Sequence, residues 1–207
     1  MGVLRRVARG YGAVLLILNL TFAAAQSAAA DEIVIAALGD SLTQGFGLPE
    51  ADGFVPQMEA WLRARGHDVR MVNAGQSGDT TAGGLSRVGW TMTEDVDAVI
   101  VALGGNDLLR GIDPEASRAN LDGILTAITE RGLPPLLIGM TAPGNYGPQW
   151  KAAFDAMYPE LAEEHGALYV ESFMAGLLPT NPTEEDISAA RGLMQDDGIH
   201  PNAEGVA

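Results

Sequence analysis

"EIVIAALGDSLTQG", residues 32–45, places a run of apolar residues directly before a polar stretch rich in turn-forming residues. The apolar residues follow one another without alternation, which is typical of a β-strand covered on both faces. Glycine, aspartate and serine are common in turns, so the triplet "GDS" is by itself compatible with a simple bend. It also places Ser41 at the carboxyl end of the predicted strand, where parallel sheets bind ligands. Ser41 is therefore either a turn residue or a nucleophile, and only other parts of the sequence can distinguish these two roles.

Apolar runs and amphipathic stretches alternate along the chain. The predicted strands are residues 32–38, 68–74, 96–103, 134–140 and 167–172, and the predicted helices are residues 54–66, 81–94, 114–132 and 149–166. Gly66, Gly132 and Gly166 end three of the helical patterns, where a left-handed cap is expected. This β-α-β-α order with short links predicts an α/β fold, with one mainly parallel five-stranded sheet between layers of helices.

The first thirty residues have the pattern of a secretory signal peptide. A basic start with Arg5, Arg6 and Arg9 precedes a short apolar run, and small residues surround an expected cleavage point after Ala30. An uncleaved membrane anchor is the alternative, but the run is short for a bilayer span, and polar residues interrupt it. We therefore expect a single mature domain, residues 31–207, that is exported to the periplasm or secreted and has no stable membrane insertion.

Composition excludes several classes of function. The formal net charge is −15, and it becomes −18 once the three arginines of the leader are removed. Such an acidic chain would be repelled by nucleic acid phosphates and by anionic lipid headgroups. The chain has no cysteine, which excludes disulfides and thiolate chemistry, and no cofactor motif is present. A small-molecule substrate is the expected partner, and the sequence does not indicate an oligomeric state.

Polar motifs follow each of the first three predicted strands. "GDSLTQG" follows the first strand, "NAGQSGDTT" the second and "GGNDLLRG" the third. Because parallel strands end at the same edge of the sheet, the three motifs are expected to lie together. Gly78 and Asn106 could then supply hydrogen-bond donors for a developing oxyanion, together with the backbone N–H of Ser41. Taken alone, Gly78 is equally compatible with a turn, and Asn106 with an Asx cap.

A nucleophilic serine needs a base and a group that orients the base. Of the three histidines, His67 lies in a turn at the opposite sheet end, and His165 ends a helix, where the helix dipole favours a cation. His200 lies in the polar turn "MQDDGIHPN", three residues after Asp197, with Asp196 as an alternative carboxylate. A metal site of these three residues is a poor fit to zinc geometry, so no metal is expected.

The combined motifs resemble those of the SGNH hydrolases, also called the GDSL family. The similarity is close to the bacterial arylesterase and acyl-CoA thioesterase/lysophospholipase branch, in "LGDSLTQG", "NAGQSGDTT", "GGNDLLRG", "NYG" and "MQDDGIHPN", and it extends from Ile33 to the C-terminus. The resemblance implies a flavodoxin-like, three-layer α/β/α sandwich. It also implies Ser41 as nucleophile, His200 as base and Asp197 as its orienting carboxylate, with Ser41, Gly78 and Asn106 forming the oxyanion hole.

The function implied by this resemblance is hydrolysis of acyl esters and thioesters through an acyl-enzyme. Leu108, Leu109, Tyr146 and Trp150 lie in the two loops best placed to line an acyl groove, although each could equally pack in the core. Two alternatives remain: a carbohydrate acetylesterase of the same superfamily, and a non-catalytic protein that binds acyl ligands. Members of this branch continue into a terminal helix where this chain has only residues 201–207, so we also expect truncation at the C-terminus.

Overall fold

The computed structural model describes residues 32–178 and 183–207, and it contains all five predicted strands. They are β1 (Ile33–Gly39), β2 (Val69–Gly75), β3 (Ala98–Ala102), β4 (Pro135–Ile138) and β5 (Leu168–Val170). Each neighbouring pair is parallel, and the strand order is β2-β1-β3-β4-β5. This is the order of a doubly wound sheet of the flavodoxin type, and it confirms the predicted fold class.

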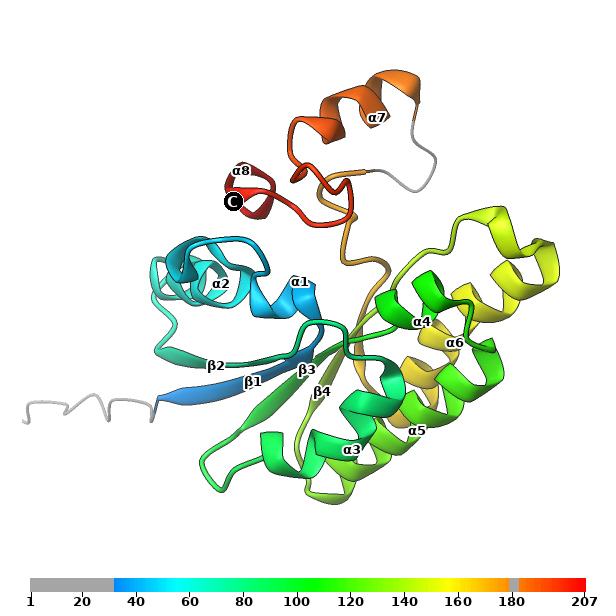
Figure 1. Ribbon diagram of the computed structural model, residues 1–207. Helices are drawn as coiled ribbons and strands as arrows, with labels where there is room; N and C mark the ends of the chain where they lie inside the picture. The colour runs from blue at the N-terminus through cyan, green and yellow to red at the C-terminus, as the bar shows by residue number, and fades with distance from the viewer. Residues whose placement is uncertain (1–31, 179–182) are drawn as a thin grey trace, which may run out of the picture. The chain divides into compact units, whose positions relative to one another are not determined.

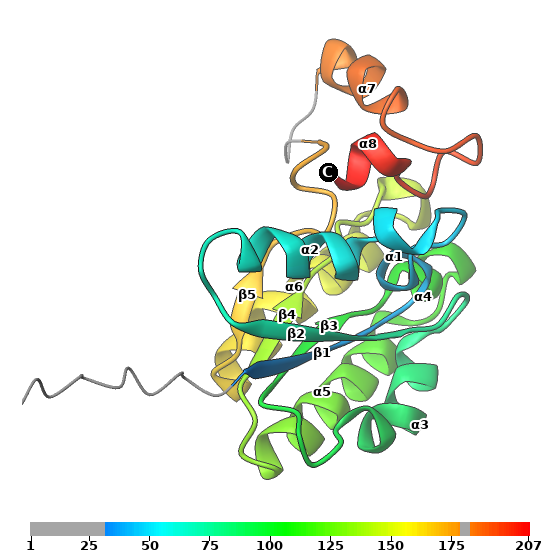
Figure 2. The ribbon, with the colours of Figure 1, turned by 90° about the vertical axis from the view of Figure 1, so that its left-hand side faces the viewer.

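Helices cover both faces of the sheet and make three layers. Figures 1 and 2 show α2 (Phe54–Arg63) on one face, and α3 (Thr81–Thr91), α5 (Pro114–Glu130) and α6 (Pro148–His165) on the other. The larger part of the core lies between the sheet and the second group, where Leu121, Ile124, Phe154 and Tyr158 are fully buried. Val55 of α2 is the centre of the smaller core on the opposite face. All four predicted helices are present, and α2 and α3 end three residues earlier than predicted.

Several short elements were not predicted, because they are too short or too polar to show a periodic apolar pattern. They are α1 (Ser41–Gln44), η1 (Glu50–Asp52), α4 (Gly105–Arg110), η2 (Gly144–Tyr146), α7 (Glu184–Arg191) and α8 (Ala203–Val206). The Asp40 carboxylate caps α1 by accepting a hydrogen bond from the Leu42 N–H, 3.0 Å away, and Gly45 ends the helix with a left-handed φ of 84°. Local capping thus shapes the segment that carries Ser41.

The ends of β1, β2 and β3 lie side by side in the sheet. Gly39 at the end of β1 pairs in register with Gly75 of β2 and with Ala102 of β3. A Cβ on Gly39 would lie 1.9 Å from Thr43 Oγ1, and one on Gly75 would lie 2.3 Å from the Gln44 nitrogen. Glycine at these two positions therefore lets α1 lie directly across the strand ends. Three segments leave the sheet here, residues 40–48, 76–81 and 103–111, and together we call them the strand-end segments.

Burial is less complete at the sheet edge and beside α2. The prediction of strands covered on both faces holds for β3, whereas the edge strand β5 is exposed, with Leu168 at 72%. An apolar groove of about 640 Å³ lies next to α2, lined among others by Ile35, Met58 and Leu136.

The proposed leader, residues 1–30, lies outside the described residues. Within the described ranges, no helix combines the length and apolarity needed to span a membrane.

Candidate active site

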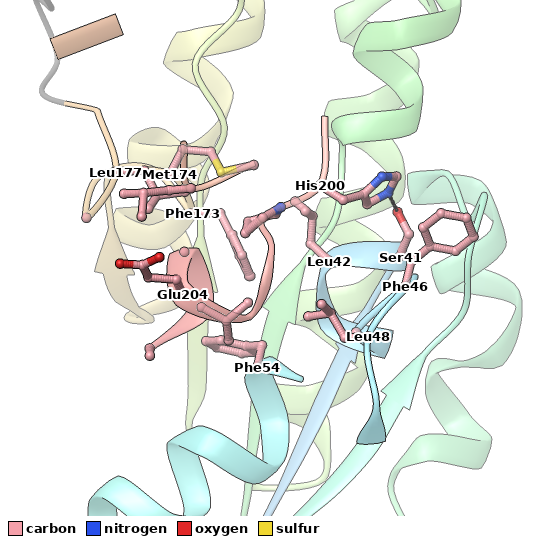
Figure 3. A pocket seen from close by; sticks show the side chains of 17 residues that line it. Ser41, Leu42, Phe46, Leu48, Phe54, Phe173, Met174, Leu177, His200 and Glu204 are labelled. Carbon is pink, nitrogen blue, oxygen red and sulfur yellow. Dashed lines mark hydrogen bonds between the residues drawn. The ribbon is translucent and has the colours of Figure 1, made fainter. Parts of the chain in front are cut away.

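Ser41, His200 and Asp197 form a continuous chain of polar contacts at the strand ends. The Ser41 Oγ lies 2.7 Å from His200 Nε2, and His200 Nδ1 lies 2.6 Å from Asp197 Oδ2. Figure 3 shows the imidazole directed at the serine hydroxyl, among side chains that line a cavity. The two groups come from positions 159 residues apart, so the structure brings together the nucleophile and base that the sequence suggested.

The hydrogen-bond partners of His200 determine which of its ring nitrogens carries a proton. The N–H groups of His200 and Ile199 donate to Asp197 Oδ1 at 3.0 and 2.9 Å, and together with the His200 ring they lower the pKa of Asp197 to about 2. An ionised carboxylate can only accept hydrogen bonds, so Nδ1 must carry the proton that faces Asp197. In a neutral imidazole Nε2 is then an acceptor for the Ser41 hydroxyl, which is the arrangement that a general base needs.

The expected oxyanion donors surround a cavity of about 220 Å³ beside Ser41. Ser41, Gly78, Asn106 and His200 line it together, as do apolar residues that include Leu109 and Ile199. Gly78 has a φ of 84°, which a residue with a Cβ adopts only with strain. The alternative role of Asn106 as a helix cap does not apply, because Gly104 holds the N-cap position of α4 and Asn106 lies inside that helix.

Asp40 is a buried carboxylate between the nucleophile and Asn106. Its side chain is 2% exposed, and Oδ2 accepts a hydrogen bond from Asn106 Nδ2 at 3.4 Å. Burial raises the pKa of Asp40 to about 6, although its hydrogen bonds to Leu42 and Asn106 partly offset that effect. One amide hydrogen of Asn106 therefore faces Asp40, which leaves the second hydrogen for a substrate oxygen. Asp40 was not among the residues predicted for the site, because an aspartate after a strand is ordinary in a turn.

A buried aspartate joins the segments that carry Gly78 and Asn106. Asp107 is fully buried, and its carboxylate accepts from the Thr81 hydroxyl at 2.6 Å, the Thr81 N–H at 2.9 Å and the Ser117 hydroxyl at 2.9 Å. Arg110 of the same helix donates to the Gly78 carbonyl at 2.8 Å. These bonds hold α4 against the start of α3, so the two donors keep a fixed separation.

Arg87 of α3 forms hydrogen bonds with the ends of β1 and β2 and with Asp79. Its guanidinium donates to Asp79 Oδ2 at 2.5 Å, to the Ala74 carbonyl at 2.6 Å and to the Gly39 carbonyl at 2.7 Å. The planar fork of arginine suits this task, because its donors point in fixed directions. One side chain thus joins the ends of β1 and β2 to the segment that carries Gly78.

A second cavity, of about 400 Å³, also contains Ser41, and Figure 3 shows the side chains that line it. Phe46 lines both cavities, and its ring centroid lies 4.7 Å from that of His200. The further lining is mostly apolar, and it includes Leu42, Leu48, Phe54, Phe173, Met174, Leu177, Leu193 and Val206, with Glu204 as an acidic exception. No sequence pattern indicated these residues, because they converge from segments that are distant in the chain.

The four residues predicted to contact an acyl chain have different positions. Leu109 is 58% exposed and lines the smaller cavity beside Ser41. Leu108 and Trp150 instead pack against the core, where the Trp150 ring stacks on Phe154 at 5.0 Å. Tyr146 lies against Trp150, and neither cavity that contains Ser41 is lined by Leu108, Tyr146 or Trp150. Leu108 and Trp150 thus contribute to packing, whereas Tyr146 is 42% exposed, and a role of these three residues in binding an acyl chain stays a prediction.

The other two histidines lie away from Ser41. His67 is exposed between α2 and β2, and His165 ends α6 with Nε2 at 2.7 Å from Asp122 Oδ1. Asp122, Glu164 and His165 have potential metal ligands within 4.8 Å of one another, but Glu164 is paired with Arg118 at 2.5 Å. Because Asp122 Oδ1, His165 Nε2 and Glu164 Oε1 already have protein partners, we assign no metal to this cluster.

Known proteins are similar to this chain in sequence. A model of the GDSL-like lipase/acylhydrolase family matches residues 37–207. The chain is 37% identical to esterase TesA of Pseudomonas aeruginosa over 177 residues, 85% of this chain and 82% of that protein. It is 35% identical to thioesterase 1/protease 1/lysophospholipase L1 of Escherichia coli over 189 residues, which cover 91% of this chain and 82% of that protein.

Solved structures give the same result. AlinE4, an SGNH-hydrolase family esterase, has 40% sequence identity and a TM-score of 0.73, with 86% of this chain and 90% of that chain covered. The psychrotrophic esterase EstA from Pseudoalteromonas sp., inhibited by monoethylphosphonate, has 27% identity and a TM-score of 0.74, with coverage of 84% and 91%. With a family model matching most of its length and this site at the strand ends, the chain belongs to the GDSL-like lipase/acylhydrolase family.

Proposed function

We propose that this protein is an exported serine esterase that hydrolyses carboxylic esters, and in vitro also thioesters, through an acyl-enzyme. The observation that carries the proposal is the uninterrupted contact from Ser41 Oγ through His200 to Asp197, beside a cavity that Ser41, Gly78 and Asn106 line together. The names of the relatives, an esterase, a thioesterase/lysophospholipase and an arylesterase, support the same range of substrates. A binding protein without catalytic activity would have no need for this hydrogen-bonded arrangement.

In the first step Ser41 Oγ attacks the carbonyl carbon while its proton passes to His200 Nε2. The imidazolium is stabilised by Asp197, which stays ionised because its pKa is about 2. The carbonyl oxygen gains the negative charge and accepts hydrogen bonds from the Ser41 and Gly78 N–H groups and from Asn106 Nδ2. Collapse of this intermediate breaks the bond to the alcohol or thiol, which leaves with the proton from His200.

The second step repeats the chemistry with water as nucleophile. His200 takes one proton from the water as its oxygen attacks the acyl carbon, and the same three donors hold the second oxyanion. When the bond from Ser41 Oγ to the acyl carbon breaks, the serine oxygen recovers the proton from His200. A carboxylic acid is released, and the enzyme returns to its starting state.

The lining of the site favours acyl groups longer than acetyl. Phe46, Leu109 and Ile199 are exposed apolar side chains around Ser41, with exposed fractions of 48%, 58% and 42%. An acetyl group would leave most of this surface in water, whereas each buried CH₂ of a longer chain contributes about 0.8 kcal/mol. We therefore favour aryl esters and lysophospholipids over acetylated polysaccharides. A profile of kcat/KM against acyl length would favour the acetylesterase alternative if it peaked at two carbons.

Labelling with a fluorophosphonate probe tests the proposal, because only an activated serine reacts with it. The inhibition of EstA by monoethylphosphonate makes a phosphonate reagent a suitable choice. Ser41→Ala should abolish labelling and lower the turnover of p-nitrophenyl butyrate on the order of 10⁶-fold. Ser86→Ala, on the exposed side of α3 and away from both cavities that contain Ser41, is the matched control and should retain labelling. Full turnover by Ser41→Ala would refute the proposal.

Export is the second part of the proposal and has its own test. Its support is the sequence of residues 1–30, with a basic start, an apolar run and small residues before Asp31. Expression of the full chain in a bacterial host, followed by fractionation and N-terminal sequencing, should give a periplasmic or secreted protein that begins near Asp31. A product that keeps residues 1–30 in the membrane fraction would instead favour an uncleaved anchor.

A further inference from the structure

Gln195 joins the loop of His200 to the segment that follows Ser41. Its side-chain Nε2 donates to the Phe46 carbonyl at 2.7 Å, across 149 residues of sequence, and to the Pro201 carbonyl at 2.9 Å. Its backbone N–H donates to the His200 carbonyl at 2.7 Å. One carboxamide thus uses both of its N–H bonds on two backbone segments, each directly adjacent to a proposed catalytic loop.

The His200 loop has little other attachment to the body of the domain. We call residues 183–207 the C-terminal segment, and within it only Ala190 and Pro201 are buried. Two hydrogen bonds connect it with the strand-end segments, the Ser41–His200 bond and the Gln195–Phe46 bond. Contact of the Phe46 ring with the His200 ring adds an apolar component at the same place.

Gly47 leaves space for the Gln195 side chain because it has no Cβ. It has a left-handed φ of 76°, and a Cβ at this position would lie 2.1 Å from Gln195 Oε1. Any other residue would therefore be strained in its backbone and would push the carboxamide away. The turn after α1 and the Gln195 side chain fit together as a unit.

The hydrogen bond between Ser41 and His200 cannot by itself hold their two loops together throughout the reaction. During acyl transfer the Ser41 oxygen becomes bonded to the substrate, so its hydrogen bond to His200 is lost for part of each cycle. The Gln195–Phe46 bond involves no reacting atom and remains in place. We propose that Gln195 is a positioning residue, which keeps His200 Nε2 aligned with Ser41 by clamping the two loops. This proposal rests on the proposed function.

Two substitutions remove the clamp in different ways. Gln195→Met keeps the length of the side chain and loses both donors, and Gln195→Glu places a carboxylate against two carbonyl oxygens. We expect kcat for p-nitrophenyl butyrate and the rate constant of fluorophosphonate labelling to fall on the order of 10²-fold in Gln195→Met, as for a small misplacement of reacting groups. Gln195→Glu should lose more, and KM should stay nearly unchanged.

Gln57→Met is the matched control, because Gln57 Nε2 also donates to a backbone carbonyl, that of Asp52 at 3.0 Å, away from Ser41. It should keep both rate constants. The labelling experiment remains informative for a variant that folds poorly, because the rate constant of labelling does not depend on how many molecules are folded and reactive. The proposal is overturned if Gln195→Met retains the wild-type rate constants, or if only KM changes.

The His200 ring nitrogen signals in ¹⁵N NMR separate this proposal from the proposed function. If the clamp exists, Gln195→Met shifts or broadens these signals relative to the wild type and to Gln57→Met, whether or not the protein hydrolyses esters. Absence of labelling in the wild-type protein would count against the proposed function alone. Unchanged His200 signals in Gln195→Met would count against the clamp alone.

Discussion

Ser41 follows a strand whose residues 36–39 are all buried, whereas His200 lies in a C-terminal segment where only Ala190 and Pro201 are buried. The strand-end segments are tied down by Arg87 and by the fully buried Asp107. The C-terminal segment reaches them through the bonds of Gln195 and His200. The segments that carry the expected oxyanion donors are thus anchored by Arg87 and the buried Asp107, while few contacts attach the segment of His200 to them.

This difference separates two kinds of mutational effect. Substitutions that remove a brace in the strand-end segments should lower the free energy of unfolding, because buried groups lose their partners. Substitutions in the C-terminal segment should lower activity with little change in that free energy, since few apolar contacts depend on the segment. The following predictions test the strand-end side of this comparison, and the Gln195 variants test the other side.

Among these predictions, the largest effect is expected at Asn106, the proposed side-chain donor to the oxyanion. Asn106→Ala should lower kcat by about 10²–10³-fold with KM nearly unchanged, because the lost hydrogen bond matters most in the transition state. Steady-state kinetics with p-nitrophenyl butyrate measures this. Asn145→Ala, on the exposed η2 turn, is the control and should match the wild type. A loss confined to KM would mean that Asn106 binds the ground state rather than the oxyanion.

A smaller effect, on stability, is expected at Arg87. Arg87→Met leaves the Asp79 carboxylate and the carbonyls of Gly39 and Ala74 without their donor, which should cost about 3–4 kcal/mol of unfolding free energy. Urea denaturation followed by circular dichroism measures the change. Arg70→Met is the control, since Arg70 pairs with Asp95 on the surface, where ion pairs contribute little. Equal losses in the two variants would show that the strand ends are not braced as described.

Most of the fold could be predicted from the sequence, because apolar runs and capping glycines carry local information. Gly66, Gly132 and Gly166 all have the positive φ expected of left-handed caps. Helix α4 escaped prediction because the polar motif "GGNDLLRG" is short and resembles a loop. Helix α7 lacks an apolar stripe, although Thr183 and Asp186 form a capping box that the sequence "TEED" could have suggested.

The site was predictable only where a motif carries it. Ser41, His200 and Asp197 lie in motifs next to strands or turns. The three-residue spacing suggested that Asp197 orients His200, and only the family resemblance joined this pair to Ser41. The cavity linings and the Gln195 bond depend on segments that meet only after folding, so no local pattern encodes them. Trp150 and Leu108 illustrate the same limit, because an apolar side chain in a loop reads alike whether it packs in the core or contacts a ligand.

The finest test concerns the charge on Asp40, because burial there opposes the ionised form. The pKa of Asp40 in the folded protein is about 6, above its ordinary value of 3.8, so the folded state holds the proton more tightly than the unfolded state. The contribution of Asp40 to stability is therefore largest below pH 4, and it declines as the pH rises to about 6. A shift of this size corresponds to a decline of about 3 kcal/mol at most.

Asp40→Asn removes this titration while its side-chain oxygen can still cap α1 through the Leu42 N–H. In this variant Asn106 loses its acceptor, which lowers the free energy of unfolding by an amount that does not vary with pH. The informative quantity is therefore how the stability difference between the variant and the wild type changes with pH. Relative to the wild type, Asp40→Asn should become more stable by about 2–3 kcal/mol between pH 4 and pH 7 in urea denaturation. Asp68→Asn, at the exposed turn between α2 and β2, is the control for general charge effects. If both variants show the same pH trend, net charge rather than burial of Asp40 governs stability, and the strand-end segments carry no strain from this carboxylate.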